Sequence, residues 1–182
     1  MKKILLASAL LASTSAFAEE APVMFSTIDY NAPNVQSVKG ARLTILHGKI
    51  DTMKGLDFAL FGLSETNTTT GVNLGFWGAA KVNQSMTGAS LGIFNWIPGN
   101  TKGANLGAVN VTGDVNGANV GFVNYSEGNT AFDLAAFSKS NSSTVQVGVV
   151  NITDKINGVQ IGLINCADNG FFKCFPIINF AK

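Results

Sequence analysis

Charged and catalytic side chains are scarce in this 182-residue chain. It has 12 Lys and Arg, 11 Asp and Glu and one His, so its formal net charge is +1. One histidine cannot supply a Cys/His zinc site or a nucleophile–base pair, and the charge balance leaves no basic footprint for nucleic acid. The G-x-S-x-G, P-loop and H-E-x-x-H motifs are missing as well. These absences predict a protein that is not an enzyme, uses no cofactor or metal and does not bind nucleic acid.

Long apolar runs are also missing, because no window reaches the roughly 18 apolar residues of a membrane-spanning helix. A shorter apolar segment, Ile4–Leu11, follows two lysines and precedes the small-x-small sequence Ala16-Phe17-Ala18. This order is typical of a secretory signal peptide. We therefore expect residues 1–18 to be a bacterial signal peptide and the mature chain to begin at Glu19.

Cysteine is limited to Cys166 and Cys174. An even number of cysteines in an exported protein favours a disulfide. We expect these two residues to be bonded and to tie the C-terminal end of the chain together.

What the chain does contain is a repeat, seen most clearly as Gly-Val-Gln-Ile-Gly-Leu-Ile-Asn at residues 158–165. Each unit is numbered here from position 0, its first residue, to position 7. Successive units begin about 15 residues apart, and such a nearly fixed period indicates a repeat architecture. Ten units begin at Gly40, Gly55, Gly71, Gly88, Gly103, Gly117, Ala131, Thr144, Gly158 and Phe172.

Within a unit, apolar residues at positions 1, 3 and 5 alternate with polar residues at position 2. This alternation predicts a β-strand whose apolar face is buried. Position 4 is glycine in six units, which indicates close approach of another backbone or side chain. Position 7 is asparagine in six units and predicts a turn at the end of the strand. Those asparagines are Asn95, Asn110, Asn124, Asn151, Asn165 and Asn179.

Two all-β architectures fit these units. In a β-solenoid of about ten short coils, like residues stack on like residues every ~4.8 Å. In an antiparallel up-and-down meander or barrel, each unit is one strand. The strict identity of the columns favours the solenoid. Residues 19–39 lack the repeat and are expected to cap the β-repeat domain, residues 40–182.

The units resemble those of the bacterial surface repeat-containing proteins, which carry tandem G-V-Q-I-G-L-I-N phrases at a similarly short and regular spacing. The similarity runs from Gly40 to about Phe180 and is strongest at residues 144–151 and 158–165. The closing Phe175–Phe180 also looks like that family's terminal unit. The resemblance implies the envelope of a Gram-negative bacterium and brings no catalytic residue with it.

Position 6 departs from simple alternation because it is apolar where a polar residue is expected. Either a bend turns this column inward, or it forms an exposed apolar stripe, which would mark an interface or membrane contact. The candidate binding stripe comprises Phe61, Trp77, Phe94, Val109, Val123, Phe137, Val150 and Ile164.

Other polar residues have simpler interpretations. His47 falls in the asparagine column and is expected at a corner rather than in a site. Asp114 and its counterparts in connecting segments match no calcium-loop spacing and are expected in solvated turns. Asp57 and Asp133 share position 2 but lie five units apart, too far for a catalytic pair.

The sequence thus predicts a non-enzymatic protein of the periplasm, outer membrane or cell surface that acts through its repeat surface. The partner would be a protein, a glycan or the envelope membrane, and self-association into a homo-oligomer is a further alternative. The competing hypothesis is a small outer-membrane β-barrel protein.

Overall fold

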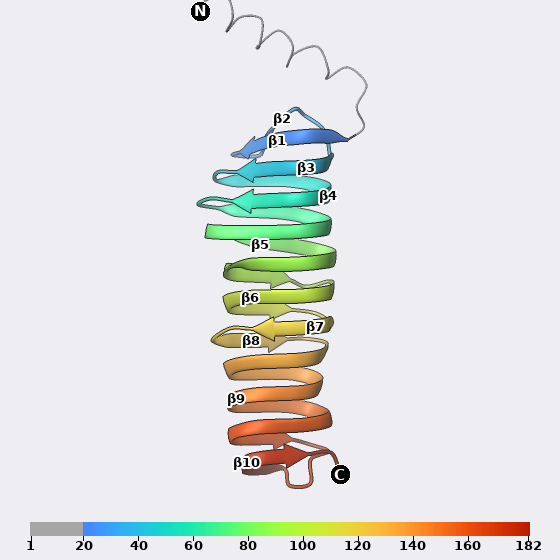
Figure 1. Cartoon of the computed structure of the whole chain (residues 1–182), viewed down its shortest axis with the longest axis vertical. Coiled ribbons are helices and arrows are strands. Elements are labelled where there is room, and N and C mark those ends of the chain that lie inside the picture. The colour runs from blue at the N-terminus through green and yellow to red at the C-terminus, as the bar shows by residue number, and fades with distance from the viewer. Residues whose placement is uncertain (1–19) are drawn as a thin grey trace, which may run out of the picture.

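The computed structural model describes residues 20–182, and the signal peptide expected at residues 1–18 lies outside this range. The described chain winds into one narrow β-solenoid of about eight turns, with β1 and β2 at one end and β10 at the other (Figure 1). None of its residues forms a helix long and apolar enough to cross a membrane.

The strands follow the coils, and the longest run around several corners without interruption. They are β1 (Ala21–Thr27), β2 (Tyr30–Ala32), β3 (Ser37–Thr44), β4 (His47–Ala59), β5 (Leu63–Ile97), β6 (Asn100–Thr112), β7 (Val115–Val120), β8 (Val123–Ser126), β9 (Asn129–Ala167) and β10 (Cys174–Phe180). Each coil contributes one segment to a front sheet, over positions 0 to 4, and one to a back sheet that begins near position 6.

Neighbouring coils pair in parallel and in register. Gly40 is opposite Gly55, Gly55 is opposite Gly71, and Gly103 is opposite both Gly88 and Gly117. On the back sheet Val109 lies between Phe94 and Val123 in the same way. Like therefore stacks on like, which confirms the solenoid, and the antiparallel alternative is not adopted.

A glycine corner opens each of the first six coils. Gly103 has φ of +137°, a conformation that other residues rarely adopt, and a Cβ there would lie 1.9 Å from the carbonyl oxygen of Gly88. The register shifts between Val115 and Ala118, and the next coil begins with Ala131. Beyond this shift the corner no longer needs a positive φ, so Ala131 and Thr144 replace glycine at position 0.

The sidedness of the strands is the reverse of the expectation. Position 2 is buried in every coil from Arg42 to Gln160, and positions 1, 3 and 5 point outward. The prediction that the apolar face is buried was wrong. The coil is so thin that its inner columns face each other at close range. Ladders of hydrogen-bonding side chains fill much of that space, and buried apolar residues such as Met53, Val82 and Ile97 fill the rest.

The two ends are closed differently. At the N-terminal end β1 pairs in parallel with β3, and the short β2 pairs antiparallel on its outer side. At the C-terminal end β10 returns antiparallel along β9, so the tenth unit is a hairpin rather than a coil. The expected Cys166–Cys174 disulfide joins the two strands of this hairpin and is confirmed. Pro176 lies in the terminal strand, where the register shifts between Phe175 and Ile177.

Candidate binding surface

Hydrogen-bond ladders organise much of the interior of the solenoid, so the apolar side chains of the front sheet are left for the surface. Asn95 Nδ2 donates to Asn110 Oδ1 at 2.8 Å, and Asn110 Nδ2 donates to Asn124 Oδ1 at 2.9 Å. Asn151 and Asn165 continue the column with a bond of 2.8 Å. The asparagine column is thus a buried ladder, as the stacking of like residues predicts for a solenoid. The asparagines lie within strands, so the prediction that they end a strand with a turn was wrong.

The same asparagines also satisfy backbone groups at the bend. Asn110 Nδ2 donates to the carbonyl of Val120 at 3.1 Å, and Asn151 Nδ2 donates to that of Ile161 at 3.0 Å. Room for this bond comes from position 4, because a Cβ on Gly162 would lie 2.7 Å from Asn151 Nδ2. The close approach predicted for the glycine column is therefore confirmed.

Position 2 forms a second ladder inside the front sheet. Asn105 donates to Asn119 Oδ1 at 2.9 Å, and Asn119 donates to Asp133 Oδ1 at 3.2 Å. Further along, Gln160 donates to Gln146 at 2.7 Å. Burial raises the pKa of Asp133, although hydrogen bonds from Thr130 and Asn119 oppose the shift. The other members of this ladder are neutral amides, so its hydrogen bonds do not require a charged side chain.

Nearer the N-terminus, position 2 holds a buried ion pair instead. Arg42 Nε lies 3.5 Å from Asp57 Oδ1, and Ser64 donates to the other carboxylate oxygen at 2.5 Å. Arg42 also donates to the carbonyl of Gly48 at 2.8 Å. Burial raises the pKa of Asp57, and the charge of Arg42 and the bond from Ser64 oppose this rise. The two position 2 carboxylates are thus enclosed in separate polar networks and do not meet.

With polar groups inside, the front sheet presents its apolar residues outward. The term front face is used here for the side chains at positions 1, 3 and 5 of the repeat units between Gly40 and Asn165, where each of these positions is apolar. Its most exposed members are Phe122, at 72%, Leu163 and Phe76. Its position 3 column is Leu43, Phe58, Leu74, Leu91, Leu106, Val120, Leu134, Val147 and Ile161.

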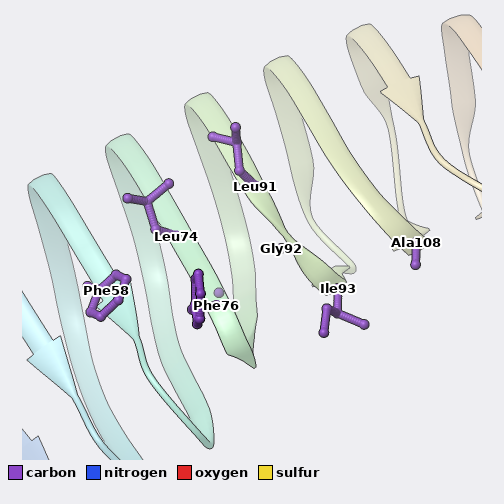
Figure 2. Close-up of a pocket in the computed structure, with 8 residues that line it drawn as sticks. Phe58, Leu74, Phe76, Leu91, Gly92, Ile93 and Ala108 are labelled. Atoms are coloured by element: carbon purple, nitrogen blue, oxygen red, sulfur yellow. The ribbon is translucent and has the colours of Figure 1, made fainter.

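A shallow groove runs along this face where the chain bends at position 4. Figure 2 shows its two banks, with Phe58, Leu74 and Leu91 on one and Phe76, Ile93 and Ala108 on the other. Gly75 and Gly92 lie between the banks, and the open space is about 370 Å³. The lining carries no titratable side chain, so the groove is suited to apolar contact.

The term back face is used here for the outward side of the second segment of each coil. Its side chains change from charged to apolar along the axis of the solenoid. Near the N-terminus it is charged: Glu65 lies 3.4 Å from Lys49 and 3.5 Å from Lys81. From Phe94 onward it is largely apolar, with Trp96 opposite Val111 and Val111 opposite Tyr125. Lys81 and Lys139 lie over the rings of Trp96 and Tyr125.

The predicted stripe divides between two places. Phe94, Val109, Val123 and Phe137 pair in succession on the back face, and Val150 and Ile164 precede inward asparagines in the same way. Phe61 and Trp77 lie instead on a protruding corner, because Leu63 takes the back-face position opposite His47. None of the eight residues is buried, so the column faces outward and the inward-bend alternative is wrong.

Other residues singled out from the sequence have local roles. His47 is not in the asparagine ladder; it begins β4, and its Nδ1 lies 2.5 Å from Asp29 Oδ1. Asp114 and Asp168 are exposed outside the strands, as expected of turns. Asp154 is exposed as well but lies within β9 rather than in a turn. Among the described residues, no group of three His, Cys, Asp or Glu side chains is arranged to hold a metal ion.

Sequence reasoning missed the front face, because the apolar alternation predicts that positions 1, 3 and 5 form the core. Parallel coils in register, filled by amide ladders, define this chain as a β-solenoid repeat protein. Comparison with protein-family models, curated proteins and solved structures finds no match to it.

Proposed function

We propose that this chain is an exported, non-enzymatic β-repeat protein of the bacterial cell envelope that binds, or builds structure, through its repeat surface. The proposal includes its membership of the bacterial surface repeat-containing proteins. The single observation that carries the binding role is the uninterrupted apolar front face, maintained in every repeat unit from Gly40 to Asn165.

This surface is at least as large as the largest apolar patches of ordinary soluble proteins, which reach roughly 300–600 Å². Exposed contiguous patches beyond a few hundred Å² mark interaction sites. The amide ladders already organise the interior, so the outward columns do not have to be apolar to fill a core. An apolar residue kept at every outward position of the front sheet therefore supports a role in contact with something else.

A non-enzymatic role is supported by where the carboxylates lie. Asp57 and Asp133 are buried in networks with Ser64 and with Thr130, and neither lines the groove beside Phe58 and Leu74. The groove beside Phe58 and Leu74 thus has apolar walls, and its lining contains no acid or base.

The experiment expresses the full chain in a Gram-negative host and fractionates the cells, with protease treatment of intact cells to separate surface from periplasm. We expect a processed chain in the periplasmic or membrane fraction, retained there by apolar contact. The variant Leu91→Glu, on the front face, should lose that retention while its circular dichroism spectrum is unchanged. An unprocessed cytoplasmic chain would overturn the envelope role.

A further inference from the structure

We propose that the front face is a self-association surface, on which a second copy of this chain packs sheet against sheet. This inference rests on the proposed function and names the partner of the same surface. Its starting point is the apolar character of positions 1, 3 and 5 together with the regular stacking of the coils.

The area of the face fits a stable dimer. Eight coil spacings separate Leu43 from Ile161, about 38 Å at ~4.8 Å per spacing. Positions 1 to 5 span about 16 Å along the strand direction, at ~3.3 Å per residue. The footprint of the face is therefore about 600 Å² per copy, within the roughly 600–1,000 Å² that each partner buries in a standard protein–protein interface.

The spacing of the face fits another copy better than an irregular partner. Rows such as Leu74–Leu91 and Phe76–Ile93 recur once per coil, and their banks are separated by the groove over Gly75 and Gly92 (Figure 2). A second front face has the same repeat, so ridges of one copy can enter grooves of the other along its whole length. Two sheets packed in this way lie about 10 Å apart.

The chemistry of the face also favours a protein over a lipid surface. Elements that lie at a membrane interface combine an apolar side with tryptophan, tyrosine and a rim rich in Lys and Arg. Positions 1, 3 and 5 contain no tryptophan or tyrosine between Gly40 and Asn165. The adjoining column before position 0 carries Lys39, Lys54 and Lys102, and Lys54 is already paired with Glu20 at 2.7 Å. A continuous basic rim is therefore not formed.

The test compares one coil on its two faces. Leu91 on the front and Trp96 on the back are 37% and 39% exposed, so Leu91→Glu and Trp96→Glu are matched variants. Sedimentation velocity of the full mature chain in detergent-free buffer should give twice the chain mass for the unsubstituted protein and for Trp96→Glu. Leu91→Glu should raise the dimer Kd at least tenfold without altering the circular dichroism spectrum.

Cysteine cross-linking gives a second measurement that does not depend on introducing a charge. The native cysteines are bonded to each other, so Leu106→Cys in the middle coil supplies a single reactive thiol on the front face. It should form covalent dimers with a short bismaleimide, whereas Val111→Cys on the back face of the same coil should not. Equal cross-linking of the two variants would overturn the assignment to the front face.

Binding to vesicles separates this inference from the proposed function. A chain that stays monomeric at all concentrations and floats with phosphatidylglycerol-containing vesicles, unless Leu91 is replaced by Glu, would overturn self-association and assign the face to lipid. In that case the envelope role stands. A monomeric chain that binds no vesicle, and whose retention in the envelope assay is unchanged by Leu91→Glu, would overturn both self-association and the proposed function.

Discussion

The coils before Gly88 and those after it solve the same packing problem in different ways. The early turns are long, the longest running from Gly71 to Gly88, and they enclose methionines such as Met53 as well as the Arg42–Asp57 pair. The late turns are shorter and enclose amides and hydroxyls such as those of Asn119 and Ser126. The interiors of the two regions therefore differ in composition, although large side chains such as Ile97 and Ile156 are fully buried in the late turns as well.

The two regions also differ outside. The longer early turns push Phe61 and Trp77 onto a protruding corner and leave a charged back face around Glu65. The shorter late turns lack the protrusion, so Phe94, Val109 and their successors form a continuous apolar column. Substitutions in each region test this comparison.

The largest effect is expected at the glycine corner, in Gly103→Val. The new side chain would meet φ of +137° and the carbonyl of Gly88, so unfolding should become easier by more than about 4 kcal/mol. Thr144→Val is the control, since Thr144 takes position 0 where no positive φ is needed, and it should change stability little. Urea denaturation measures both. Equal losses would show that the two corners do not differ.

The second effect concerns the ion pair of the early coils. Arg42→Met leaves Asp57 buried without its cation and should cost about 3–5 kcal/mol. The double variant Arg42→Met/Asp57→Leu removes both charges and should be closer to the original stability. Denaturant midpoints of the two variants give the comparison. A double variant less stable than the single one would mean that the wide interior depends on the pair itself.

The periodicity of the sequence was sufficient to predict the solenoid, the stacking of like residues and the disulfide. It could not show which side of the strand faces inward, because alternation separates two faces without identifying the core. The usual assumption that the apolar residues of a strand are buried failed here, since the buried position 2 column is filled by hydrogen-bonding side chains such as Asn105 and Asn119. The sequence feature that could have revealed the inward-facing side is the Gly-x-x-Asn spacing of Gly107 and Asn110, which recurs in coil after coil.

The stripe was only partly predictable for a related reason. Phe61 and Phe94 share position 6 when the units are aligned by sequence. The extra residues of the early turns are inserted between positions 6 and 8, so Leu63 takes the back-face position instead. Wider spacings between units mark those turns, but spacing alone does not show where in the coil the extra residues lie.

The third expected effect is a gain in stability, which is possible because the asparagine ladder is interrupted in the late coils. Ser138 replaces asparagine there, and both Ser138 Oγ and Asn151 Oδ1 are buried without a partner. The same coil has Ala135 where its neighbours have glycine. The double variant Ala135→Gly/Ser138→Asn should join the two ladder segments and add about 1–2 kcal/mol of stability, measured by urea denaturation. Ser138→Asn alone should add less, because the Ala135 methyl group remains.

The fourth effect depends on pH. Burial raises the pKa of Asp133 in the folded state, so the stability contributed by its protonated form is present at low pH. That contribution is lost as pH rises through the folded pKa. Asp133→Asn should be insensitive to this change, and the stability difference between variant and original should grow in favour of the variant as pH rises from about 4. A difference independent of pH would show that the carboxyl stays ionised in the ladder.

The smallest effect is expected on the protruding corner of the early coils. Trp77 is 65% exposed and packs edge-on against Phe76. Trp77→Ser should therefore lower stability by less than about 1 kcal/mol, whereas truncating a buried aromatic costs about 3–5 kcal/mol. Thermal denaturation decides between the two values, with Trp96→Ser on the back face as the control of similar chemistry.

In most small domains the same side chains both hold the fold together and determine what the surface can be. In this solenoid the hydrogen-bonded columns inside hold the fold together, and the outer residues form the surface. Because amides and hydroxyls keep the coils in register from within, natural selection can alter the outer residues with little risk of unfolding the chain. Adding or deleting one coil would lengthen or shorten the column by a fixed step and leave the remaining ones intact. Such a scaffold can diversify its exterior rapidly while its backbone stays the same.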